Sequence, residues 1–400
     1  MSWRNLLKSR RQGPRAQQSK QDASRGGQGD GQGDHRLTTF FALGASPALA
    51  VILMFGGISL LGDLVHEGAR GANSQYFALL GVSAAQIGLV FGLGEFLGYF
   101  VRLFAGVLAD RSGRHWPFML AGYSLLLAVP LLGLTQNWNA VVVLVLMERL
   151  GKALRNPSKD TLLSGIAAGD PSDANKPGRI GVGLAFGIQE ALDQLGAFGG
   201  PLIFTLVFAL AGSAGLAEYQ LGYRLLIIPF ILLILFVAFA WRKVSAAALL
   251  PDHRPAAAHG YQSQKLQPVF WLYTAFTFFA TLGFVNFSLV GYHLKSQGLL
   301  ADGHITLLYS MAMAVDALVA LLAGRSYDRL KYRRGGGRMN GSGGLALLIF
   351  IPVASVLLPV LSLSRYVTLI VLGMLVFGAI LGFHETIMRS AIADLTPFHK

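Results

Sequence analysis

The sequence predicts an all-α protein that crosses a lipid bilayer several times. Of its 400 residues, 53% are hydrophobic and only 13% are charged, whereas a soluble domain carries about 25% charged residues. Ten apolar stretches are each long enough to cross roughly 30 Å of hydrocarbon as a helix. They cover approximately residues 45–78, 84–108, 116–135, 138–156, 178–212, 220–241, 268–294, 303–324, 342–362 and 366–390.

The distribution of positive charge predicts how these helices are oriented. With the N-terminal arm in the cytoplasm, 28 of the 33 Lys and Arg residues fall on the inner side, as the positive-inside rule requires. An even number of crossings places both termini in the cytoplasm. No stacking aromatic residues accompany the basic residues, so the net charge of +13 does not indicate a nucleic-acid partner. The Ala-, Gly- and Leu-rich composition favours a bacterial cytoplasmic (inner) membrane.

The chain divides into four regions. Residues 1–36 are rich in Gln, Gly, Ser and Arg, which predicts a disordered basic cytoplasmic arm, with a short membrane-surface anchor as the alternative. Residues 37–242 form a predicted N-terminal half of six helices. A Pro-, Ala- and His-rich cytoplasmic linker, 243–267, leads to a C-terminal half of four helices, 268–400.

Two loops in the predicted halves repeat one another. The first reads Gly106-Val-Leu-Ala-Asp110-Arg111-Ser-Gly113-Arg114, and the second contains Gly324-Arg325-Ser-Tyr-Asp328-Arg329. The two Asp-Arg pairs are 218 residues apart. Related halves of this size are typical of transporters.

These residues resemble the major facilitator superfamily. The first loop matches that family's cytoplasmic motif G-x-L-A-D-R-x-G-R and departs only at the next position, where His115 replaces the usual Lys or Arg. The run from Glu148 to Pro157 loosely resembles the Arg- and Gly-bearing fourth helix of the family. In the fifth span, a third pattern is similar to the family's antiporter motif, although Phe204-Thr205 replaces two glycines at its end. Its residues are Gly187, Gly196, Gly200 and Pro201.

The resemblance implies twelve helices in a two-half pseudo-repeat, whereas about ten are expected here, six and four. Ser164 and Ser390 correspond in a weaker part of the repeat, yet 78 residues follow the first as far as Arg242 and only ten follow the second. We therefore expect that the last two helices are absent. In that case either the chain is truncated, or it obtains the missing helices from another molecule by oligomerisation.

Ionisable groups inside a bilayer cost roughly 2.5–3.5 kcal/mol each and are functional candidates. We expect four acids to form the substrate and proton-coupling site, with Arg102 as the balancing cation: Asp63, Glu67, Glu190 and Asp193. Alternatively, Arg102 neutralises Glu95 or another acid and holds the bundle together. Gln189 adds polar character, and the role of Asp316 is left open.

The loop and glycine motifs have both functional and structural interpretations. Asp110 can pair with a cytoplasmic Arg or cap a helix N-terminus, which would latch one conformation. Otherwise the loop is a solvated turn. The motif glycines let helices approach closely and Pro201 can kink its helix. The resemblance adds an expectation of exchange, and hence of export.

Other chemistry finds no support in the sequence. The chain has no Cys, and it shows no metal cluster, nucleophile–base pair or phosphate loop, so we expect no enzyme, cofactor or metal. The function predicted is a secondary active transporter that moves a small solute by alternating access, with proton-coupled export. The alternative is a non-transporting protein of the same ancestry, acting as a scaffold or inactive. The substrate, the coupling ion and the oligomeric state stay open.

Overall fold

The computed structural model describes residues 47–168, 182–246, 268–282, 284–333 and 344–388. Within these residues the secondary structure is helical, as predicted. The α-helices are α1 (Pro47–Leu79), α2 (Ala84–Ser112), α3 (His115–Ser124), α4 (Ala128–Leu131), α5 (Trp138–Ala168), α6 (Val182–Ala211), α7 (Leu216–Leu225), α8 (Ile227–Ala246), α9 (Pro268–Leu282), α10 (Phe287–Ser296), α11 (Asp302–Arg333), α12 (Phe350–Ser362) and α13 (Val367–Phe383). Four short helical segments complete the described set. Three are 3-10 helices, η1 (Leu125–Leu127), η2 (Leu132–Leu134) and η3 (Gly344–Ile349), and one is a π-helix, η4 (His384–Met388).

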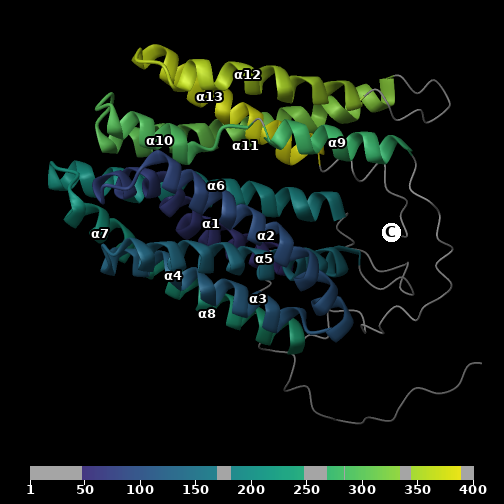
Figure 1. The fold of residues 1–400 in the computed structure, drawn as a ribbon. Coiled ribbons are helices and arrows are strands. Elements are labelled where there is room, and N and C mark those ends of the chain that lie inside the picture. Colours follow the sequence, from purple (N-terminus) through teal and green to yellow (C-terminus); the bar gives the residue numbers. More distant parts are fainter. Residues whose placement is uncertain (1–46, 169–181, 247–267, 283, 334–343, 389–400) are drawn as a thin grey trace, which may run out of the picture. The chain divides into compact units, whose positions relative to one another are not determined.

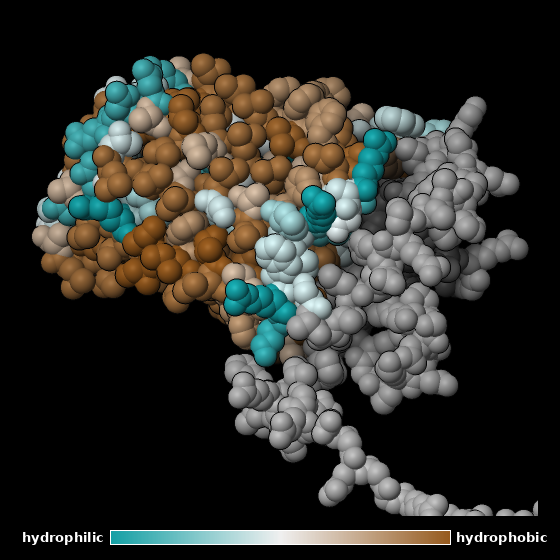
Figure 2. Space-filling model, turned by 90° about the horizontal axis from the view of Figure 1, so that it is seen from below, coloured by the Kyte–Doolittle hydropathy of each residue, from teal (hydrophilic) through white to brown (hydrophobic). Residues whose placement is uncertain are grey.

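The surface of these helices suits a bilayer. Seven helical segments of the described chain are long and apolar enough to cross a membrane, and two shorter apolar helices accompany them. Large apolar side chains are exposed along them, for example Leu89 on α2 and Leu210 on α6. Figure 2 shows one face on which hydrophobic residues form a broad band, with hydrophilic residues at one end and beside the part drawn in grey. The chain is an integral membrane protein.

Each of the ten predicted spans coincides with helix, but several are interrupted. The stretch 268–294 is two helices, because the side chain of Asn286 accepts the Ser288 N–H and caps a new helix, α10. Such a cap stabilises a helix start. The stretch 220–241 is likewise divided between α7 and α8 at Leu226. The stretch 138–156 is longer than predicted, since α5 continues to Ala168.

Buried apolar side chains form two larger clusters in the described residues. One draws on α1 to α8, and the other draws on α9 to α13 together with Ala197 of α6. In Figure 1, α9, α10, α12 and α13 lie on one side of α1 and α6, whereas α3, α5 and α8 lie on the other. Direct packing of α6 on α11 and of α1 on α10 connects the two groups.

Some predicted regions lie outside the described residues. These are the arm 1–36 and the linker beyond Ala246. The division of the chain into halves of six and four helices stays a prediction. Asp328 and Arg329 lie in α11, but the described side chains of this helix end at Ser326.

Candidate functional site

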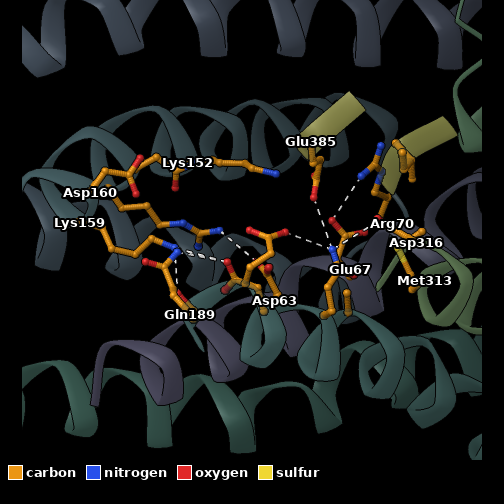
Figure 3. A pocket seen from close by; sticks show the side chains of 18 of the residues that line it. Asp63, Glu67, Arg70, Lys152, Lys159, Asp160, Gln189, Met313, Asp316 and Glu385 are labelled. Atoms are coloured by element: carbon orange, nitrogen blue, oxygen red, sulfur yellow. Dashed lines mark hydrogen bonds and ion pairs between the residues drawn. The ribbon is translucent and has the colours of Figure 1, made fainter. Parts of the chain in front are cut away.

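A cavity of about 670 Å³ lies among helices from both core clusters. Most of its lining residues are polar or charged, and the aliphatic lining residues are Ala197, Met313 and Leu381. Five lining residues are basic: Arg70, Arg102, Lys152, Arg155 and Lys159. Seven are acidic: Asp63, Glu67, Asp160, Glu190, Asp193, Asp316 and Glu385. The described lining therefore carries two more acids than bases. These charged residues come from α1, α2, α5, α6, α11 and η4, which meet at this point (Figure 3).

The cavity gathers all but one of the predicted intramembrane residues. Gln189 lines it together with six predicted ionisable residues: Asp63, Glu67, Arg102, Glu190, Asp193 and Asp316. Glu95 is the exception, because it lies outside the lining and pairs with Arg149, at 2.8 Å between Oε1 and Nη1. The helices that bring these residues together are α1, α2, α6 and α11.

Three basic lining residues come from α5 and were not predicted. Lys152, Arg155 and Lys159 follow one another at intervals of three and four, which places them on one face of a helix. From the sequence they count among the positive charges of the inner side, at or just beyond the end of the predicted span 138–156, whereas α5 continues to Ala168. Their spacing was the signal that could have assigned them to a buried face.

Two of these bases pair with predicted acids. The Lys159 ammonium donates to Ser59 Oγ at 2.8 Å and lies 3.7 Å from Asp193 Oδ2. Arg155 Nη2 lies 3.8 Å from Asp63 Oδ1. Arg102, by contrast, forms no ion pair with a described acid, and its guanidinium lies 5.1 Å from the centroid of the Tyr99 ring. Its role as the balancing cation stays a prediction.

Two cavity cations have donors that the described residues do not satisfy. Arg155 is 3% exposed, and its Nη1 is buried without a hydrogen-bond partner in the described part of the chain. Lys152 Nζ contacts His66 Nε2 at 3.2 Å and forms no ion pair with a described carboxylate. His66 in turn contacts Glu148, at 2.5 Å between Nδ1 and Oε1. Cationic hydrogen-bond donors are therefore available to a bound solute on the α5 side.

Three carboxylates crowd around one amide on the opposite side. The Gln194 amide nitrogen lies within hydrogen-bond distance of three carboxylate oxygens, 3.3 Å from Glu190 Oε1 and 3.4 Å from both Asp316 Oδ2 and Glu385 Oε2. An amide nitrogen carries only two hydrogens, so it cannot satisfy three carboxylates at once. Asp316 is 2% exposed, and its Oδ1 has no hydrogen-bond partner among the described residues. Glu385 was not predicted as part of the site.

Glu67 connects the two groups of helices at the edge of the cavity. Tyr309 of α11 donates its hydroxyl to Glu67 Oε2 at 2.5 Å, and Arg70 Nη1 lies 3.3 Å from Glu67 Oε1. Beyond the cavity, α6 and α11 also contact each other directly. The Thr205 hydroxyl of α6 lies 2.7 Å from that of Thr306 on α11. This end of the cavity, which we call the sealed end, is therefore closed by contacts of Tyr309 and Thr306.

The glycine motif of α6 packs against α1 at two of its three glycines. A Cβ atom at Gly196 would meet the carbonyl oxygen of Leu60, and one at Gly200 would lie 2.6 Å from Gly68 N. Pro201 packs on Gly71, where an added Cβ would lie 2.9 Å from the proline Cβ. Gly187, by contrast, has no atom within 4 Å of such a Cβ. The motif thus sets the close approach of α6 to α1 on one side of the cavity.

The loop motif lies at the end of α2, away from the cavity. Gly113 ends the helix in the left-handed conformation, at φ 63°, which glycine adopts without strain. The Asp110 side chain is 64% exposed, and its described ion-pair contact is His115 Nε2 at 3.9 Å. Arg111 and Arg114 are exposed, and Gly106 faces Pro157 of α5. The gating latch stays a prediction.

The cavity's chemistry is that of a polar binding chamber. The described residues include no group of three metal-ligating side chains arranged to hold a metal ion. The cavity volume falls within the roughly 300–1,000 Å³ of small-molecule sites. Paired acids and bases with spare donors and acceptors can bind a hydrophilic solute and exchange protons.

Comparison with known proteins finds relatives along most of the chain. An uncharacterized protein of Mycobacterium tuberculosis is 36% identical over 358 residues, which cover 87% of this chain and 80% of that protein. An uncharacterized MFS-type transporter of Methanocaldococcus jannaschii is 29% identical over 160 residues, or 40% of this chain and 37% of that protein. Neither similarity identifies a solute.

Two solved transporters share the fold. A bacterial homologue of the human lysosomal transporter Spinster superposes with a TM-score of 0.61 at 16% identity, over 89% of this chain and 76% of its own. The nucleoside transporter NupG gives a TM-score of 0.60 at 16% identity, over 86% of this chain and 82% of its own. The family model of the Major Facilitator Superfamily matches residues 37–400, and the chain therefore belongs to this superfamily of membrane transporters rather than to the enzymes.

Proposed function

We propose that this chain is a secondary active transporter that exports a small hydrophilic solute by alternating access in exchange for protons. The observation that carries the proposal is the cavity of about 670 Å³, lined by acids and bases from both groups of helices. Its seven acidic and five basic lining residues favour a hydrophilic solute. The contacts of the sealed end support a chamber that faces one side of the membrane at a time.

The acids around Gln194 support proton coupling. Glu190, Asp316 and Glu385 all approach one amide nitrogen that can donate only two hydrogen bonds. A proton on one of these carboxyls would reduce the repulsion between like charges. Asp316, with one buried oxygen that lacks a described partner, is our candidate for the carboxyl that carries the proton.

Support for export is indirect. It comes from the resemblance of the α6 glycine motif to an antiporter pattern, together with the close contacts of Gly196 and Gly200 with α1. In exchange, solute and protons occupy the same chamber in turn. We further propose a bacterial inner membrane with both termini in the cytoplasm, from the distribution of Lys and Arg along the sequence.

Cysteine accessibility tests alternating access directly, because the chain has no native Cys. Asn156→Cys places a thiol in the cavity lining, and Thr306→Cys places one at the sealed end. Each variant is treated with a membrane-impermeant thiol reagent from either side of oriented vesicles. We expect labelling of the two sites from opposite sides, with a ratio that changes with pH. Lys243→Cys, on the exposed last turn of α8, corrects for the pH dependence of thiol reactivity.

The same assay tests whether Asp316 is the carboxyl that carries the proton. Adding Asp316→Asn should leave both thiols reactive but remove the pH dependence of their ratio, because the proposed proton-carrying carboxyl is gone. A ratio that still changes with pH in this variant would exclude Asp316 as the coupling residue. Labelling of both sites from the same side under all conditions would refute alternating access and favour the non-transporting alternative.

A further inference from the structure

The cavity lining from α5 is mainly basic, whereas the lining from α11 and η4 is acidic. Lys152 and Arg155 come from one face of α5, whereas Asp316 belongs to α11 and Glu385 to η4. Figure 3 shows Lys152 and Lys159 on one side of the chamber and Asp316 and Glu385 on the other. A solute that spans the chamber therefore meets a mainly cationic surface at one end and a mainly anionic surface at the other, with Asp160 beside the α5 bases and Arg70 beside Asp316 as the exceptions.

Both surfaces retain binding capacity inside the protein. On the cationic side, Arg155 has a buried Nη1 without a described partner, and Lys152 has no described carboxylate partner. On the anionic side, Asp316 has a buried oxygen without a described partner, next to two further carboxylates. A buried polar group without a partner costs free energy, and a bound solute of matching charge would remove that cost.

We propose that the transported solute is a small zwitterion, with a carboxylate that binds Lys152 and Arg155 and a primary ammonium that binds Asp316 and its neighbouring acids. This proposal rests on the proposed function and specifies its substrate class. A solute with only a negative charge would leave Asp316 Oδ1 without a described partner. A solute with only a positive charge would leave Arg155 Nη1 without a described partner and Lys152 without a described carboxylate partner.

The proposal also gives a physical reason for exchange. The described lining has seven acids and five bases, so the empty chamber favours the uptake of positive charge. A proton and the ammonium group of the solute would compete for the same carboxylates, and occupancy by one would exclude the other. Mutually exclusive binding at a chamber that faces alternate sides produces antiport.

Sets of closely related ligands that differ in charge test this assignment with the purified protein. Free L-amino acids and dipeptides are compared with their N-acetyl derivatives, which lose the ammonium, and their methyl esters, which lose the carboxylate. Binding is measured by thermal shift and confirmed by calorimetry. We expect at least one zwitterion to bind about tenfold or more tightly than both of its singly charged analogues, since each lost ionic contact costs of the order of 1.4 kcal/mol or more. Binding of only one singly charged series, or of no compound in the panel, would overturn the proposal.

Two nearly isosteric substitutions assign the ends of the ligand. Lys152→Gln should abolish the preference for the zwitterion over its methyl ester, and Asp316→Asn should abolish the preference over the N-acetyl compound. Matched controls are Lys243→Gln, on the exposed end of α8, and Glu218→Gln, at the first turn of α7, which should preserve both preferences. A loss of affinity that does not depend on which charge the ligand carries would contradict the assignment.

The substrate assignment and the proposed function can fail separately. If no compound of the panel binds but the Asn156→Cys and Thr306→Cys labelling ratio still depends on pH and on Asp316, the zwitterion is wrong and proton-coupled alternating access survives. If a zwitterion binds with the expected charge preferences but the labelling ratio is fixed, the site is correct and the transport mechanism is wrong.

Discussion

The approach of α6 to α1 depends on particular glycines, so Gly196→Ala should destabilise the protein. The added methyl group would meet the Leu60 carbonyl oxygen, with the Leu60 carbonyl carbon at 3.0 Å and its Cα at 3.1 Å. These are backbone atoms, which cannot rotate away as a side chain could, so α1 and α6 would have to separate. Overpacking of this kind costs about 1–3 kcal/mol, and we expect the upper end of that range.

Helix propensity partly offsets this cost. Alanine favours a helix over glycine by about 1 kcal/mol, which leaves a net loss of about 2 kcal/mol for Gly196→Ala. Gly187→Ala is the matched control, because it lies on the same helix and motif but its added methyl group meets no atom within 4 Å. It should therefore be neutral or stabilising.

Thermal unfolding of the purified variants in detergent measures the difference. We expect Tm to fall by roughly 2 °C for Gly196→Ala and not to fall for Gly187→Ala. Gly200→Ala should behave like Gly196→Ala, since its methyl group would lie 2.9 Å from Gly68 Cα. An equal fall in Tm for Gly187→Ala would show that these glycines do not act through the contacts with α1.

Two further changes test the buried polar contacts. Tyr309→Phe removes a hydrogen bond to a carboxylate between α1 and α11, a contact of about 1.5–3 kcal/mol, so labelling of Thr306→Cys should rise about tenfold or more. An unchanged labelling rate would show that this bond does not hold the sealed end closed. Glu148→Gln should cost about 3–5 kcal/mol, because it breaks buried ion pairs. Glu95→Gln, at a side chain that is 40% exposed, should cost about 1 kcal/mol or less, and equal shifts in Tm would contradict this order.

Much of the fold could be predicted because the bilayer imposes a simple rule. Long apolar stretches must form helices there, and each predicted stretch coincides with helix. The interruptions were missed because hydropathy does not report backbone capping. Asn286, whose side chain accepts the Ser288 N–H, is the kind of residue that could have indicated the start of α10.

The candidate site could be predicted in part. Buried acids in apolar stretches are conspicuous, and Asp63, Glu190 and Asp316 do line one cavity. Their partners were harder to find, because Lys152 and Arg155 lie at the end of the predicted span 138–156 and are easily counted as charges of the inner side. The pairing of Glu95 with Arg149 depends on how α2 packs on α5, which spacing along one helix does not reveal.

Proton movement driven by a solute tests the central claim most directly. The protein is reconstituted into liposomes that contain a pH-sensitive dye, and each amino acid or dipeptide of the panel is added outside. Exchange predicts that at least one zwitterion makes the interior alkaline, because protons leave as the solute enters, and that Asp316→Asn abolishes the signal. Acidification would instead indicate that solute and protons move together. An unchanged internal pH with every solute that binds would contradict proton coupling.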